Sequence, residues 1–86
     1  MCRELQYLPP VAGKALVGHV LRTATVDNGD LCEIKCYSEL ECLSYNLGPH
    51  HVNGHPCELS NSDHIRHPGD LVPRPGFKYR GTEVDL

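Results

Sequence analysis

The sequence has few of the residues that build a large apolar core. Its 86 residues contain no tryptophan and only one phenylalanine, and 40% of them are hydrophobic. A chain of this length forms one small domain, because two domains would each bury too little surface. Domains this small usually need disulfides or a metal in addition to apolar packing. We therefore expect one domain whose stability depends on cross-links.

A long apolar run and a basic charge balance are also absent. No segment is apolar over the length that a bilayer requires, so we expect no membrane insertion by this chain. The formal net charge is -3, which argues against a nucleic-acid partner, since such proteins usually carry a basic surface. Arg74, Lys78 and Arg80 do form a mildly basic stretch. This stretch is expected either to be solvated surface or to contact an acidic partner such as a sulfated glycan.

Turn and strand signals alternate along the chain and predict its elements. Residues 1–13 are expected to form an irregular N-terminal lead-in, because Pro9-Pro10 blocks regular hydrogen bonding. A short helix follows, with Asp30 as the expected N-cap and Asn28 as its rival. β-Branched residues and alternation predict strands at 14–26 (bent or divided near Gly18), 41–47, 56–60 and 76–80.

Five cysteines are the candidates for the cross-links. Four are spaced C-x3-C-x5-C-x14-C, and spacing alone does not choose among their pairings. A bond between the first two is disfavoured, because two cysteines one helical turn apart strain disulfide geometry. Both are therefore expected to reach strands and fix the helix to the sheet at two points. The five are Cys32, Cys36, Cys42 and Cys57, with Cys2 standing apart.

The expected fold class is therefore α+β. It is a small antiparallel sheet of about four to five strands, with one short helix held to it by two disulfides. The apolar members of the core are expected to lie on the inner faces of these elements. They are Leu16, Val20, Leu31, Ile34, Leu43, Tyr45, Leu59 and Phe77.

Three segments of the sequence together resemble the core of a PAN/apple domain. They are Asp30-Leu31-Cys32-Glu33-Ile34-Lys35-Cys36, Cys42-Leu43-Ser44-Tyr45-Asn46 and Pro56-Cys57-Glu58-Leu59. In that family a short helix carries C-x3-C, the following strand carries C-x-S-x-N or a similar motif, and the next strand carries C-x-L. The resemblance covers about residues 14–84 and assigns residues 14–86 to a PAN/apple-like domain.

The resemblance also implies a disulfide pattern. The expected pairs are Cys32–Cys57 and Cys36–Cys42, one nested inside the other. Apple domains carry a third bridge between their N- and C-terminal segments, but no cysteine follows Cys57. We therefore expect Cys2 to be unpaired, or to pair with a cysteine of another chain or beyond this sequence.

The family resemblance further implies a non-catalytic function. Members are extracellular modules that bind proteins or carbohydrates, so the expected partner is a protein or glycan ligand. The expected setting is a larger secreted or cell-surface protein with flanking extracellular domains; residues 1–10 lack the pattern of a secretion signal. We expect ligand contacts in the loops 48–55 and 61–75, because long polar loops on a rigid scaffold often carry recognition.

The main alternative is a small intracellular zinc-binding adaptor with Cys and His ligands. Its strong signal, a pair of C-x2-C knuckles, is missing from the sequence. Histidines do cluster in the sequence. The simplest interpretation is that they are exposed loop residues, and the second interpretation is opportunistic metal binding or pH-sensitive binding. The loop histidines are His50, His51, His55, His64 and His67, while His19 lies within a predicted strand.

Catalysis is not expected from this sequence. Cys42 or Cys57 could in principle pair with a loop histidine as nucleophile and base, but nothing orients such a pair and no oxyanion-donor motif is present. No phosphate-binding glycine loop is present either. We therefore expect no enzyme activity and no cofactor.

Overall fold

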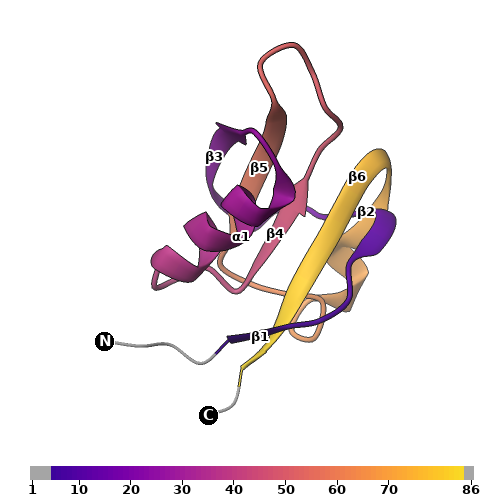
Figure 1. Ribbon diagram of the computed structural model, residues 1–86. Helices are drawn as coiled ribbons and strands as arrows, with labels where there is room; N and C mark the ends of the chain where they lie inside the picture. Colours follow the sequence, from indigo (N-terminus) through magenta and orange to yellow (C-terminus); the bar gives the residue numbers. More distant parts are fainter. Residues whose placement is uncertain (1–4, 85–86) are drawn as a thin grey trace.

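A computed structural model describes residues 5–84, and its longest strand organises the fold (Figure 1). All strand pairs are antiparallel, and the order across the sheet is β1-β6-β4-β5-β3, with β2 pairing with β6 as well. The elements are β1 (Leu5–Tyr7), β2 (Val11–Leu16), β3 (Val20–Val26), α1 (Gly29–Ser38), β4 (Ser44–Leu47), β5 (His55–Ser60), the 3-10 turn η1 (Pro68–Asp70) and β6 (Leu71–Val84).

The helix α1 begins at a side-chain cap. Asn28 has extended backbone angles, and its side-chain oxygen accepts the Leu31 amide at 3.0 Å. Asn28 is therefore the N-cap, and the expectation that Asp30 caps the helix was wrong. Asp30 instead lies inside the first turn, where its carboxylate faces the positive end of the helix dipole. In Figure 1, α1 lies across the sheet on the side of β3, β5 and β4.

Two disulfides join the helix region to the sheet. Cys32 bonds to Cys57 on β5, and Cys36 bonds to Cys42, with Cα–Cα distances of 5.7 and 5.2 Å. These are the pairs that the family resemblance implies, and the expected α+β fold class is confirmed. Cys42 lies in the turn before β4, so only one helical cysteine reaches a strand directly. Cys2 lies outside the described residues.

The disulfide sulfurs are at the centre of the core. All four bonded cysteines are fully buried, and they pack with a few apolar side chains from the strands. Tyr7 and Leu47 are half-buried against the same cluster. The buried apolar members are Val26, Tyr45 and Leu59. The cluster is thus small, and cysteine supplies four of its seven buried residues.

Three residues expected in the core lie at the surface instead. Val20 is 42% exposed on the edge strand β3, and Leu31 and Ile34 are 38% and 57% exposed on the helix. For the two helical residues the reason is helical geometry: Cys32 and Cys36, four positions apart, occupy the inward face, and Ile34 between them lies at the margin of a surface groove that Ala24 and Leu59 also line. Leu16, Tyr45 and Leu59 are buried as expected, and Leu43 and Phe77 are half-buried.

The opposite face of β4 is buried among polar groups. The Asn46 amide accepts the Leu16 backbone N–H at 2.9 Å and donates to the Leu16 carbonyl at 2.8 Å and to Glu58 at 3.0 Å. Asn46 and Leu16 are both fully buried. The Asn46 side chain therefore bonds to both backbone groups of Leu16, as a neighbouring strand would, and holds the end of β2 in place. Glu58 is in turn paired with Arg74 at 3.1 Å.

The N-terminal lead-in is more ordered than the sequence suggested. Residues 1–13 were expected to be irregular, but β1 and the first half of β2 lie within them. The proline pair Pro9-Pro10 falls in the gap between these strands, where no ladder hydrogen bond is lost. Both strands pair with β6, which begins at Leu71 rather than at Gly76 and so offers a long edge. The sheet consequently has six strands instead of four or five.

Removal of either disulfide should lower stability, and removal of the one that closes the longer loop should lower it more. Cys32–Cys57 spans 25 residues and Cys36–Cys42 spans 6. The chain-entropy model assigns about 3.5 kcal/mol to the longer loop and about 2.4 kcal/mol to the shorter. We expect Cys32→Ala/Cys57→Ala to lose more unfolding free energy in urea than Cys36→Ala/Cys42→Ala. Ile34→Ala is the control and should change little, and equal losses for all three variants would contradict the core described above.

Candidate ligand-binding pocket

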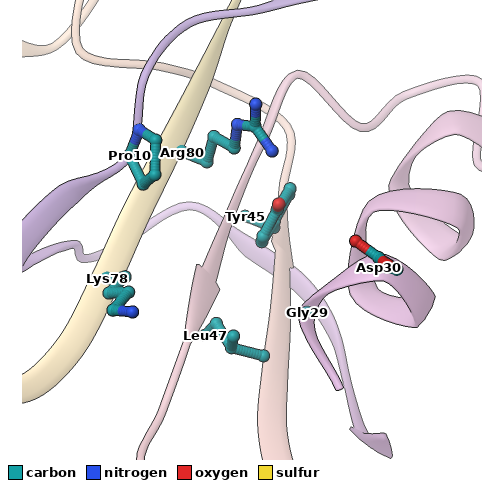
Figure 2. Close-up of a pocket in the computed structure, with 7 residues that line it drawn as sticks. All are labelled: Pro10, Gly29, Asp30, Tyr45, Leu47, Lys78 and Arg80. Carbon is teal, nitrogen blue, oxygen red and sulfur yellow. The ribbon is translucent and has the colours of Figure 1, made fainter.

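A cavity of about 150 Å³ opens between β4, β6 and the start of α1 (Figure 2). Engineered cavities of this volume accommodate a molecule the size of benzene. The pocket therefore has room for a single side chain or one small ring. Its lining consists of Pro10, Gly29, Asp30, Tyr45, Leu47, Lys78 and Arg80.

Strand register places the pocket's wall and floor. Tyr45 is opposite Arg80, and Leu47 is opposite Lys78, in the pairing of β4 with β6. Because side chains alternate along a strand, these four residues share one face of the sheet, the face covered by the helix. Figure 2 shows Lys78 and Arg80 on β6, Tyr45 and Leu47 on β4 beside them, and Asp30 on the helix across the cavity.

Arg80 connects several of the elements around the pocket. Its Nε donates to the Leu8 carbonyl at 2.9 Å, and one terminal amino group donates to the Glu33 carboxylate at 2.8 Å. The guanidinium also lies 5.5 Å from the centre of the Tyr7 ring. One side chain therefore joins β6, the segment after β1 and the helix. Its charge is largely balanced by Glu33.

Tyr45 forms part of the pocket floor and is only 5% exposed. Burial raises the pKa of its hydroxyl above 10.0, while the neighbouring Arg80, by hydrogen bond and by charge, acts in the opposite direction. Tyr45 is therefore neutral at physiological pH. It presents the pocket with an uncharged surface.

The other two charges of the pocket are unpaired. Within residues 5–84, neither Asp30 nor Lys78 forms an ion pair. Lys78 is also exposed, while Arg74 is paired with Glu58 and stacks on Phe77 at 3.8 Å. Of the basic stretch noted in the sequence, Lys78 thus remains available to a ligand.

The loops expected to contact a ligand do not line this pocket. Loop 48–55 contains a short turn in which His51 and Gly54 exchange backbone hydrogen bonds. Residues 61–70 are organised by Asp63, whose fully buried carboxylate accepts two backbone amides and binds Arg66 at 2.6 Å. Residues 71–75, expected to continue this loop, belong to β6.

Within residues 5–84, five of the six histidines, all but His51, make an aromatic contact, four of them with another histidine and His64 with Tyr79. His19 stacks on His67 with ring centres 4.2 Å apart, His19 contacts the Asp70 carboxylate at 2.7 Å, and His67 contacts the Ser62 hydroxyl at 2.6 Å. His64 bonds to the Tyr79 hydroxyl at 2.9 Å, and His55 lies edge-to-face with His50. These contacts contribute to packing of the loops against the sheet.

The described part of the chain shows no grouping of three or more His, Cys, Asp or Glu side chains suited to a metal ion. The cysteines that the zinc alternative requires are joined in disulfides, and a disulfide sulfur is not the thiolate that binds zinc. The same part of the chain contains no helix of the length and apolar character needed to cross a membrane.

Comparison with known proteins adds no relative. No family model matches the chain, and neither a curated protein nor a solved structure matches it. The fold, the disulfides and the pocket are therefore the basis for a functional proposal.

Sequence reasoning missed the pocket although part of its signal was present. The alternation of Tyr45 with Leu47, and of Lys78 with Arg80, was visible, but the register that puts these pairs side by side was not. Asp30 was interpreted as a helix cap, which gave its carboxylate a backbone partner. Because Asn28 is the cap, the carboxylate of Asp30 does not cap the helix, and Asp30 lines the cavity instead.

We expect Arg80 to contribute more to stability than an exposed arginine in a simple ion pair. Arg80→Met leaves the Leu8 carbonyl and Glu33 without their donor, and should cost about 1–2 kcal/mol of unfolding free energy. The matched control is Arg22→Met, because Arg22 is 66% exposed and pairs with Glu39 at 3.2 Å. Urea unfolding should show a change within about 0.5 kcal/mol for the control. Equal losses would refute the connecting role of Arg80.

Alkaline pH should destabilise the fold through two buried tyrosines. Burial raises the pKa of Tyr45 and of Tyr79, the latter despite the hydrogen bond from the His64 amide to its hydroxyl. Above about pH 10 the unfolded chain therefore releases tyrosine protons that the folded chain retains, and stability falls as pH rises. Urea unfolding at a series of pH values measures this slope. The double variant Tyr45→Phe/Tyr79→Phe should show a smaller slope, and an unchanged slope would be contrary to this account.

Proposed function

We propose that this protein is a non-catalytic extracellular binding module that recognises a partner protein through the pocket between α1 and the sheet. The single observation that carries the proposal is a preformed cavity with unpaired charges on a covalently cross-linked scaffold. Ligand sites are usually apolar with a few fixed polar groups, and this pocket has that composition on a smaller scale. The resemblance to PAN/apple domains supports the same function.

The disulfides support an extracellular setting. Structural disulfides persist in oxidising compartments, and small secreted domains use them in place of a large core. Both features are combined in this chain, where cysteines occupy the centre of a small core. The proposed parent is a secreted or cell-surface protein in which this module is one of several domains.

Rigidity is the physical advantage of this arrangement for binding. The pocket takes residues from α1, β4, β6 and the segment before β2. The helix is bonded to β5 and to the turn before β4, and Arg80 joins it to β6. A site held in place before binding loses less conformational entropy when a ligand enters.

Binding arrays test this function directly. The recombinant oxidised module, displayed as a multimer, is applied to arrays of extracellular proteins and glycans. We expect a protein ligand whose signal falls about tenfold or more with Lys78→Glu, since that change reverses the unpaired charge of the pocket. The matched control Lys35→Glu reverses an exposed helix charge outside the pocket and should leave the signal unchanged. A ligand that binds Lys78→Glu as well as the parent, or no ligand at all, would contradict the proposal.

A further inference from the structure

The two unpaired charges of the pocket have opposite signs and lie on opposite walls. Lys78 projects from β6, and Asp30 projects from the first turn of α1 (Figure 2). They form no ion pair with each other, so the nitrogen and the nearer oxygen lie beyond ion-pair distance. A ligand that satisfies both must carry an anionic end and a cationic end with a spacer between them.

The surface between these charges is apolar. Leu47 and the Tyr45 ring lie on β4 between the two walls, and Pro10 adds a third apolar side chain at the rim. Such a floor suits the methylene groups of a ligand, because their burial is favourable at roughly 0.8 kcal/mol per CH₂ group. The spacer between the charged ends is therefore expected to be an aliphatic chain.

The volume limits the ligand to one residue. A cavity of about 150 Å³ holds a six-carbon group but not several residues or sugar rings. A single residue that carries a carboxylate, an aliphatic chain and an ammonium group is a lysine at the C-terminus of a chain. Its backbone carboxylate and its side-chain ammonium are the two ends, and four methylenes separate the ammonium from the α-carbon.

We propose that the pocket binds the C-terminal lysine of a partner protein. This inference rests on the proposed binding function and names its ligand class. The terminal carboxylate contacts Lys78, beside the Arg80–Glu33 pair, and the ligand ammonium contacts Asp30. The lysine methylenes lie on Leu47 and Tyr45.

A sulfated glycan fits the pocket less well. Asp30 repels a polyanion, and the charges of Arg74 and Arg80 are already paired with Glu58 and Glu33. The charge pattern thus favours a ligand with both signs over one with a single sign.

Three probes of nearly equal size separate the contributions of the two charges. Nα-acetyl-lysine has both charged groups, its carboxamide lacks the carboxylate, and Nα-acetyl-norleucine lacks the ammonium group. Each is titrated into the isotope-labelled, oxidised protein while amide chemical shifts are recorded. We expect Nα-acetyl-lysine to shift Gly29, Asp30, Leu47 and Lys78, with a dissociation constant on the order of 1 mM.

Each missing charge should weaken binding by about 10- to 100-fold. The same loss is expected for Nα-acetyl-lysine with Asp30→Asn or Lys78→Gln. The matched controls Glu83→Gln and Lys35→Gln change exposed charges outside the lining and should bind as the parent does. Equal shifts from all three probes, shifts outside the pocket, or no shift with Nα-acetyl-lysine would each overturn the lysine assignment.

The titration tests the lysine assignment, and the binding array tests the binding function, so the two proposals can fail independently. If the lysine probe fails but an array ligand still depends on Lys78, the pocket is a binding site and the ligand class is wrong. If array binding is independent of Lys78, the binding function proposed for the pocket is wrong as well. A peptide array ligand that loses binding when its C-terminal lysine is amidated supports both proposals.

Discussion

The bond between helix and sheet is covalent, and the rest of the structure depends on it. Most amphipathic helices dock through an apolar stripe. In α1 the inward positions belong to Cys32 and Cys36, both fully buried, while Ile34 and Leu31 face outward. The disulfides thus replace the apolar face. This allows a core with few large side chains, which is the composition the sequence has.

The same constraint shapes the pocket. Since the disulfides fix the helix next to β5 and β4, its first turn lies opposite β6 with a cavity between them. Arg80 adds a noncovalent connection by joining Glu33 and the Leu8 carbonyl. The charged group of Asp30 is then held away from Lys78.

The sequence predicted what local chemistry determines. Cysteine spacing and its family resemblance gave the disulfides, and β-branched segments gave most of the strands. Prediction from the sequence failed for features that depend on pairing between segments distant in the chain. Residues 5–13 have weak strand signals of their own and become β1 and part of β2 because β6 offers an edge. Asn46 has no apolar character, yet it is fully buried because its amide bonds to Leu16. The pocket was missed because register, and not composition, brings Lys78 beside Leu47.

Amide hydrogen exchange before and after reduction tests the central claim most directly. If covalent bonds hold α1 to the sheet, reduction should abolish protection of the α1 amides, while the amides shared by β4 and β6 keep more of theirs. Fully protected α1 amides in the reduced protein would contradict the claim, because apolar packing alone would then suffice to dock the helix.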